Sequence, residues 1–402
     1  MKLILSLLLF CGMLPPALHG QSPPVFNDKG WRLAVPGWKF EFPRDHGSHD
    51  QFQTEWWYYT GNLREIKTGR RFGYQLTFFR QGILPPDAPG KSPKSDPAHP
   101  GARSAWRFHH YYFAHFALTD VTGKKFHAFS KNARGSAMDD VFFSPGTQTL
   151  RIGDWSIRTG VSGTFALSRE GKPTETLSDV YRLRARDGSV AIDLSCVRLK
   201  PYVFHGMDGV SQKSSALGNA THYFSMTRMA TSGTVTLGNK TFEVEGSSWF
   251  DKEFGTNQLA KDQQGWDWLS LQLDNNEELM VYILRTKDGG ISPESGGTFI
   301  AADGSSRHLK AADFQLAILD HWKSRASGAR YPARWRLSIP SLDCTLEIKP
   351  LLRDQELFLR QTTTLIYWEG ACEASGTRAG RRVTAQGYTE LTGYAGDLTV
   401  GF

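Results

Sequence analysis

The segment from Thr54 to Leu63, TEWWYYTGNL, places four consecutive aromatic side chains behind a carboxylate. A second run, FGYQLTFFR, covers residues 72–80, and the Gly61-Asn62 pair between the two runs is a turn signal. Because successive residues of a strand point to opposite faces, such a hairpin would carry aromatic side chains on both faces of its sheet. A sheet of this kind fits a barrel wall, in which one face packs and the other lines a cavity.

A related pattern returns later in the chain. Residues 266–273 read WDWLSLQL, residues 274–277 form a polar turn, and residues 279–285 read LMVYILR. Both segments consist of an aromatic run, a polar turn and an alternating strand that ends in arginine. Two hairpins of one design predict two copies of one domain.

Length and composition agree with an all-β chain of two domains. A chain of 402 residues is long for one β domain, and 12% aromatic residues with 40 glycines suit many strands and turns. Turn signals recur every eight to twelve residues or so, which is the spacing of a β-sandwich or barrel. The segment 311–324 is a weak candidate for an amphipathic helix.

The N-terminus has the pattern of a secretory signal peptide. Lys2 precedes a short apolar run and two prolines, and the run is too short to span a bilayer permanently. We therefore assign residues 1–20 to a signal peptide and expect a secreted or periplasmic protein with no transmembrane span in the mature chain. A lipid anchor at Cys11 is not expected, because Phe10 stands where a lipid-attachment motif has a small residue.

The rest of the chain divides by composition. Residues 21–50 predict an extended N-terminal arm, residues 51–218 the first domain and residues 219–402 the second, with the junction in a loose, glycine-containing stretch. The proline-rich segment 81–104 predicts a long connection, and connections of that length are often functional or mobile.

Several classes of function have no support in the sequence. The net charge of +7 comes from basic residues scattered among acidic ones, so we expect no nucleic-acid partner. His109 and His115 would share a strand face but lie about 20 Å apart, and no HExxH motif is present, so we expect no metal site and no cofactor. No GxSxG nucleophile elbow supports nucleophilic hydrolysis.

Three cysteines follow the signal peptide: Cys196, Cys344 and Cys372. Cys344 and Cys372 lie in strand-like segments and could pair in an oxidising compartment. Unpaired, buried thiols are the favoured alternative. The absence of a CxxC motif argues against a zinc ribbon or a redox dithiol.

Five motifs, in order, resemble those of one family. They are Glu55-Trp56-Trp57-Tyr58, WFDKEFG at residues 249–255, GWDW at 265–268, YWEG at 367–370, and the segment Gly387–Tyr394. Together they resemble the AttH-like secreted proteins, often labelled predicted secreted hydrolases, and the related carotenoid 1,2-hydratases. The resemblance covers residues 45–395 and implies two tandem lipocalin-like β-barrel domains packed side by side.

The resemblance also implies an activity. Carotenoid hydratases add water across a terminal isoprenoid double bond, with an aspartic acid as proton donor helped by a histidine and aromatic neighbours. Asp251 matches the aspartate and His222 the histidine. Phe224 stands where the family has a tryptophan, and Trp249 where it has a tyrosine. These two departures leave the substrate open.

The residues around Asp251 fit that chemistry. Aromatic neighbours would desolvate the carboxyl and favour its neutral form, which could protonate an alkene. His222 could then activate water, and Glu253 would share a strand face with Asp251, an arrangement that also suits acid/base hydrolysis. Alternatively, Asp251 pairs with Lys252 or Arg285, or caps a turn.

The aromatic segments predict a cavity near the domain interface. Its expected ligand-binding residues are Trp57, Tyr59, Phe224, Trp249, Trp266, Trp268 and Tyr282. In any one strand these side chains could simply be core. We expect Glu55 to be a structural carboxylate in an ion pair with Arg80 or Arg107, because a buried charge needs a partner.

The sequence thus predicts a secreted lipocalin-like protein that binds an elongated hydrophobic molecule, either a lipid or an isoprenoid. If the protein is an enzyme, it is a hydratase or a hydrolase whose acid/base chemistry centres on Asp251. The alternative is a non-catalytic carrier, or an accessory protein of an ABC-type permease in the envelope.

Overall fold

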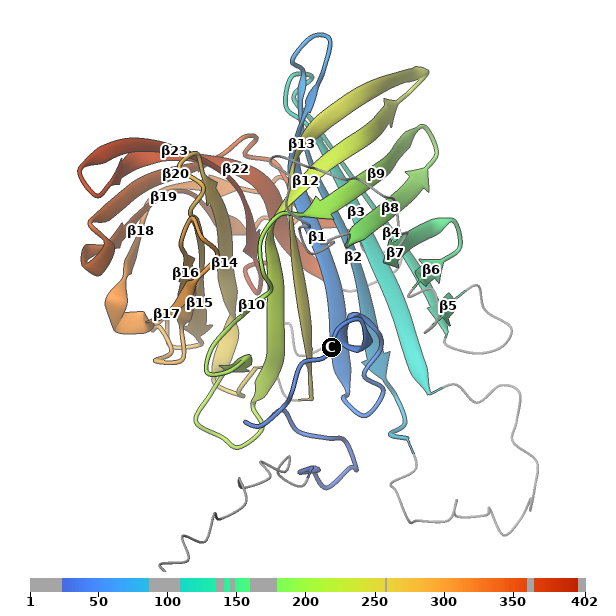
Figure 1. Ribbon diagram of the computed structural model, residues 1–402, viewed down its shortest axis with the longest axis vertical. Coiled ribbons are helices and arrows are strands. Elements are labelled where there is room, and N and C mark those ends of the chain that lie inside the picture. Colours follow the sequence, from blue (N-terminus) through green and yellow to red (C-terminus); the bar gives the residue numbers. More distant parts are fainter. Residues whose placement is uncertain are drawn as a thin grey trace, which may run out of the picture.

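The computed structural model describes residues 24–86, 109–134, 141–144, 149–159, 179–256, 259–359 and 365–396. Two curled, nearly closed antiparallel sheets lie side by side in it (Figure 1). The helices of the described residues are short 3₁₀ turns, at Arg44–His46, Ala311–Asp313 and Pro340–Leu342. The all-β prediction, with two tandem lipocalin-like barrels, is therefore confirmed. The predicted signal peptide, Cys11 and most of the proline-rich segment lie outside the described residues.

The first sheet has thirteen strands in the order β4-β3-β2-β1-β13-β12-β9-β8-β7-β6-β5, with β10 and β11 paired to β12. Its strands are β1 (Thr54–Glu65), β2 (Arg71–Gly82), β3 (His110–Asp120), β4 (Lys125–Arg134), β5 (Val141–Ser144), β6 (Thr149–Ile152), β7 (Trp155–Thr159), β8 (Val180–Asp187), β9 (Val190–Arg198), β10 (Val203–Phe204), β11 (Val210–Gln212), β12 (Ala220–Leu237) and β13 (Lys240–Gly255).

The second sheet has ten strands in the order β17-β16-β15-β14-β23-β22-β20-β19-β18, with β21 paired to β22. Its strands are β14 (Gln263–Leu273), β15 (Glu278–Thr286), β16 (Gly296–Ile300), β17 (Ser306–Lys310), β18 (Gln315–Lys323), β19 (Arg330–Ile339), β20 (Cys344–Pro350), β21 (Glu356–Phe358), β22 (Ile366–Arg378) and β23 (Arg381–Leu391). In both sheets the first hairpin pairs with the last strand, β1 with β13 and β14 with β23. This shared topology is what a duplication would produce.

The sheets divide later in the chain than the predicted junction. Strands β12 and β13 follow residue 218, yet β13 pairs along its length with β1 and β12 pairs with β9. A boundary between residues 218 and 219 would separate these two strands from their hydrogen-bonded neighbours. The first sheet instead ends at Gly255, and the second begins at Gln263.

Two local predictions were wrong. Gly61-Asn62 is not the hairpin turn, because both residues lie inside β1, opposite Tyr74 and Gly73. A side chain at Gly61 would meet the Tyr74 ring at 2.4 Å, so the glycine provides room for an aromatic ring. Most of the helix candidate 311–324 is strand β18, which pairs with β19.

The three cysteines of the described residues are free and buried. Cys344 lies opposite Arg378 and Cys372 opposite Pro350, so the two thiols sit at opposite ends of the β20–β22 pair. This placement confirms the favoured prediction of unpaired thiols. Across the described residues, no helix has the length and apolar character needed to cross a membrane.

Strand β1 explains why both faces of the hairpin are aromatic. Trp57 and Tyr59 point into the core of the first sheet, whereas Trp56 and Tyr58 belong to a cluster shared with the second sheet. The N-terminal arm packs against the first core, since Trp57 donates from Nε1 to the His46 carbonyl at 2.8 Å. The alternation predicted for the hairpin therefore separates a packed core from an inter-sheet face.

The two sheets contact each other closely where β2 meets β22. A Cβ added at Gly73 would lie 2.4 Å from the Cβ of Ala371. Nearby, Asn62 donates from Nδ2 to the Gly387 carbonyl at 3.0 Å, and Thr119 donates to Gln355 at 2.7 Å. These contacts fix the width of the space between the sheets.

We expect Gly73→Ala to destabilise the protein by about 1–3 kcal/mol, because the added methyl group has no room at a packed interface. The backbone at Gly73 lies outside the left-handed region, so the effect would come from the contact with Ala371. Urea unfolding followed by tryptophan fluorescence measures the change. The double variant Gly73→Ala/Ala371→Gly should recover part of the loss; additive losses would contradict this explanation.

Candidate functional site

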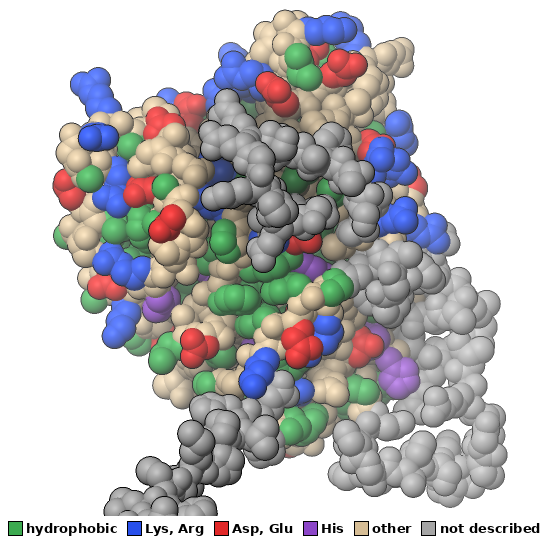
Figure 2. Space-filling view, in the orientation of Figure 1, with side chains coloured by type: hydrophobic (Ala, Val, Ile, Leu, Met, Phe, Trp, Pro, Cys, Tyr) green, Lys and Arg blue, Asp and Glu red, His purple; other side chains and the backbone are tan. Residues whose placement is uncertain are grey.

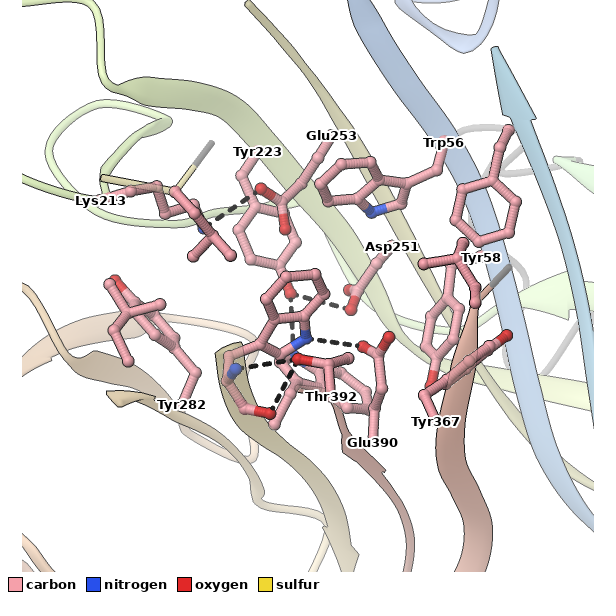
Figure 3. A pocket seen from close by; sticks show the side chains of 16 residues that line it. Trp56, Tyr58, Lys213, Tyr223, Asp251, Glu253, Tyr282, Tyr367, Glu390 and Thr392 are labelled. Atoms are coloured by element: carbon pink, nitrogen blue, oxygen red, sulfur yellow. Dashed lines mark hydrogen bonds and ion pairs between the residues drawn. The ribbon is translucent and has the colours of Figure 1, made fainter. Parts of the chain in front are cut away.

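A cavity opens between the two sheets (Figure 3). Its walls are Trp56, Tyr58, Phe79, Lys213, Tyr223, Asp251, Glu253, Leu259, Trp266, Trp268, Tyr282, Leu284, Leu365, Tyr367, Glu390 and Thr392. The cavity has a volume of about 70 Å³, enough for a handful of waters. Figure 2 shows hydrophobic side chains gathered in the middle of this face of the molecule, with charged side chains mostly around them.

Asp251 is the most deeply placed acid of this cavity. It lies on β13 opposite Tyr58 of β1 and Ser225 of β12. Three donors hold the carboxylate: Tyr223 at 2.8 Å, Trp249 Nε1 at 2.6 Å, and the hydroxyl of Ser225.

No cation compensates Asp251 among the described residues. The two alternative partners are engaged elsewhere, since Lys252 bonds Glu55 and Arg285 bonds Asp267 at 2.8 Å. Burial raises the pKa of Asp251 to about 7, against the opposing effect of its three hydrogen bonds. The carboxyl therefore carries a proton over much of the range below neutrality.

Glu253 lines the same cavity two residues further along β13, as the shared-face prediction required. Its carboxylate pairs with Lys213 at 3.2 Å and accepts a hydrogen bond from Thr221. The Lys213 ammonium lies 5.0 Å from the centre of the Tyr282 ring. At this end of the cavity the charge of Glu253 is therefore neutralised by Lys213.

Glu390 brings a second carboxyl to the cavity, from β23 of the other sheet, and none of the described lysines or arginines forms an ion pair with it. Trp266 donates from Nε1 to its Oε2 atom at 3.0 Å. Burial raises the pKa of Glu390 to about 7, and the nearby carboxylates of Glu253 and Asp251 act in the same direction. Figure 3 shows the carboxyl groups of Glu390 and Asp251 both directed into the cavity.

His222, the residue expected to activate water beside Asp251, does not reach the cavity. On β12, Tyr223 and Ser225 face the cavity, so the neighbouring His222 points to the opposite side of the sheet. There its ring lies between the arm and β13, 5.0 Å from Trp38 and 5.1 Å from Phe254. Because successive side chains of a strand point to opposite faces, His222 points away from the cavity and from Asp251.

A different imidazole reaches the Asp251 cluster. His205 follows β10, is buried, and bonds the Ser225 hydroxyl through Nε2 at 2.6 Å and Thr298 through Nδ1 at 2.8 Å. Its ring packs on Tyr223 with centroids 4.1 Å apart. Because Ser225 in turn donates to Asp251, His205 positions the acid through one hydroxyl.

The aromatic residues predicted to bind the ligand fall into two groups, one at the cavity between the sheets and one in the core of the first sheet. Trp266, Trp268 and Tyr282 line the cavity, and Trp249 lies behind Asp251 as a hydrogen-bond donor. Trp57, Tyr59 and Phe224 belong instead to the buried core of the first sheet and do not line this cavity.

The sequence reasoning missed several cavity residues: Trp56, Tyr58, Tyr223, Tyr367, Lys213, Glu390 and, behind them, His205. Strand parity could have found Trp56 and Tyr58 as the alternate set of the first hairpin. The Glu390 carboxyl stood in a recognised motif without a role. Nothing in the local sequence signals His205, which arrives from a loop.

Glu55 forms the predicted ion pair with Arg80, at 2.9 Å. It also accepts bonds from Lys252 at 2.5 Å and His49 at 2.6 Å, and all of these side chains are buried. Burial alone would raise the pKa of Glu55, but these cations hold it well below its usual range. The other predicted partner, Arg107, lies outside the described residues.

The two cavity acids predict an unusual pH dependence. The pKa of Asp251 is about 3.9 in an unfolded chain and is raised to about 7 in the folded protein, so the folded protein holds this proton more tightly between these two pH values. Its contribution to stability is therefore greatest at low pH and is lost as the pH rises through 7. Infrared titration should show protonated-carboxyl bands that disappear near neutrality, and Asp251→Asn should remove one of them. Loss of all such bands below about pH 5 would contradict this assignment.

Comparisons with known proteins agree with this architecture. Residues 33–394 match the family model described as AttH-like. A crystal structure of a candidate AttH protein from Nitrosomonas europaea is 29% identical, covering 90% of this chain and 98% of that one with a TM-score of 0.72. Kievitone hydratase from Nectria haematococca shares the fold at 15% identity, covering 92% and 98% of the two chains with a TM-score of 0.62. A search among curated proteins finds no match.

Proposed function

This chain belongs to the AttH-like family, and we propose that it binds a hydrophobic small molecule between its two sheets and hydrates a carbon–carbon double bond in it. One observation carries the proposal: Asp251 is a buried carboxyl that faces an aromatic cavity, pairs with no cation of the described residues, and has its pKa raised by burial to about 7. A general acid works best when its pKa lies near the working pH. The fold shared with a hydratase supports the same reaction class.

The proposed reaction begins with transfer of the Asp251 proton to an alkene carbon, which breaks the O–H bond and forms a C–H bond. The positive charge develops on the neighbouring carbon, where aromatic faces stabilise it. A water oxygen then forms the C–O bond and releases its proton to the carboxylate of Glu390. Transfer of that proton through cavity water restores Asp251, so alkene and water are converted to an alcohol with no other reactant.

The size of the cavity restricts what enters it. A cavity of about 70 Å³ holds the reacting end of a ligand rather than a whole elongated molecule. We propose that the double bond occupies the cavity while the remaining hydrophobic part of a lipid or isoprenoid lies outside it. Substituted alkenes that give a tertiary cation fit this site best.

The test uses ¹⁸O-labelled water. The purified protein is incubated with kievitone and with short trisubstituted isoprenoid alkenes, and products are analysed by mass spectrometry. The expected product is heavier than the substrate by one molecule of labelled water. Failure of every such alkene to take up the label, under conditions where the protein is folded, would refute the hydratase proposal.

A carrier remains the second candidate, and the narrow, largely aromatic cavity between the two sheets favours it because such a site can retain a ligand without changing it. In that case organic extraction would recover an unmodified hydrophobic molecule, and labelled water would not be incorporated. Export by the N-terminal leader to the periplasm or beyond, and work beside an ABC-type permease, are further proposals. Fractionation of cells and copurification from the envelope test them.

A further inference from the structure

The described part of the chain treats its buried carboxylates in two ways. Glu55, Asp267 and Glu278 each lie within ion-pair distance of at least one lysine or arginine. A second group, in which no lysine or arginine lies within ion-pair distance there, includes Glu356, Glu369, Asp251 and the partly buried Glu390. Of these, Asp251 and Glu390 line the cavity. A buried carboxylate that lacks a cation is costly, and it either stays protonated or is compensated by a ligand. The cavity is where such a ligand would lie.

The rest of the cavity wall suits a cation as well. Eight of its sixteen side chains are aromatic, and Tyr58, Trp266 and Trp268 are close to the two acids. Aromatic faces attract organic cations, and rings grouped around a carboxylate are how proteins hold quaternary ammonium groups. The one lysine of the wall, Lys213, is already neutralised by Glu253 at 3.2 Å.

We propose that the cavity is a receptor for a compact, alkyl-substituted cation held between Asp251, Glu390 and the surrounding aromatic rings. The cation can arise on the substrate, as the tertiary carbocation of hydration, or arrive as a stable ammonium group of a ligand. The first source rests on the proposed function, whereas the second is independent of it. In both cases the two carboxyls supply the charge that the cavity otherwise lacks.

The charged and titratable groups that face the acids set the expected pH dependence. They are Glu253 on the same strand, Lys213, the phenols of Tyr58 and Tyr223, and Glu369 on β22, which accepts a hydrogen bond from Tyr58. Glu369 Oε2 has no partner in the described structure, and burial raises the pKa of this group well above its ordinary value. A cation should therefore bind more tightly as Asp251 and Glu390 ionise.

The test compares choline with its neutral isostere 3,3-dimethyl-1-butanol on the full-length protein, by calorimetry at about pH 6 and about pH 8.5. Choline should bind roughly tenfold more tightly at the higher pH for each carboxylate that must ionise, since both pKa values are about 7. The alcohol should bind more weakly, with no such change. Near pH 7, choline binding should release protons, which measurements in two buffers of different ionisation enthalpy detect.

Matched variants locate the effect. Asp251→Asn and Glu390→Gln should each weaken choline binding about tenfold at high pH and flatten the pH dependence. Glu347→Gln, at an exposed carboxylate that pairs with Arg336, should change neither. Equal binding of choline and the neutral alcohol, or choline binding without proton release, would overturn the inference even if one variant fails to fold.

The same experiment separates the two sources of the cation. If the protein hydrates an alkene and choline inhibits that reaction, the cation arises on the substrate and both proposals are supported. Choline binding without any hydration supports a stable ammonium ligand and leaves the hydratase proposal refuted. Hydration that proceeds while choline fails to bind would overturn the cation receptor and leave the hydratase proposal standing.

Discussion

Replacing Asp251 with asparagine is expected to reduce alkene hydration about 100- to 10,000-fold, the usual contribution of a general acid. The amide keeps the shape of the protonated carboxyl and can still bond Tyr223 and Ser225, but it has no acidic proton to transfer. Ligand binding should therefore persist while turnover is lost. Product formation in labelled water gives the rate, and equilibrium dialysis of the unreacted alkene gives the affinity.

Asp193→Asn is the matched control, because Asp193 is a partly exposed residue of β9 and pairs with Arg182 and Arg184. Its rate should equal that of the wild type. Unchanged hydration in Asp251→Asn would rule out the proposed acid. A variant that no longer folds would show that Asp251 is needed for structure, and the retained fold must therefore be checked by circular dichroism.

Replacing Glu55 with glutamine is expected to lower the free energy of unfolding by about 3–5 kcal/mol, the range for removing one member of a buried ion pair. Glu55 is the shared acceptor of Arg80, Lys252 and His49, so its loss leaves buried cations without their carboxylate. Arg80 also donates to the carbonyls of His49 and Phe52 at 2.9 Å. The change should therefore loosen the N-terminal arm as well as the sheet.

Urea unfolding measures the stability, and limited proteolysis reports release of the arm. Glu373→Gln makes the same chemical change at a partly exposed carboxylate that pairs with Arg71 and Lys349. Exposed pairs contribute about 0–1 kcal/mol, so this control should be nearly neutral. If the two substitutions lower the free energy of unfolding equally, the ion pairs of Glu55 do not hold the N-terminal arm in place.

Much of the fold could be predicted from the pattern of residues. The repeated aromatic hairpin indicated two domains, and the structure has one such hairpin at the same topological place in each sheet. The domain boundary was less accessible, because β13 returns over nearly two hundred residues to pair with β1. Gly61-Asn62 resembled a turn because its local composition does not reveal the Tyr74 ring that needs the space.

The candidate site was predicted only in part. Asp251 and Glu253 were identified together because residues two apart share a strand face, and Trp266, Trp268 and Tyr282 followed from the second hairpin. His222 was placed beside Asp251 by motif resemblance. In the structure Ser225 is the β12 residue opposite Asp251, and His222, three residues away from Ser225, points to the other face of the sheet because side chains alternate along a strand. His205 comes from a distant loop and carries no local signal, whereas Glu390 lies in the Gly387–Tyr394 motif, which by itself does not show that this side chain faces Asp251.

The sequence by itself determined the all-β class and the repeated hairpin, and it singled out Asp251 as the candidate acid, because strand periodicity and a short motif are local properties of the chain. Only the tertiary structure decided which face of each strand meets the other sheet, and hence that Trp56 and Tyr58, not Trp57 and Tyr59, line the cavity. It also decided that no cation of the described residues pairs with Asp251. Burial and the absence of a counter-charge depend on what distant segments bring, and these two conditions raise the pKa of this carboxyl.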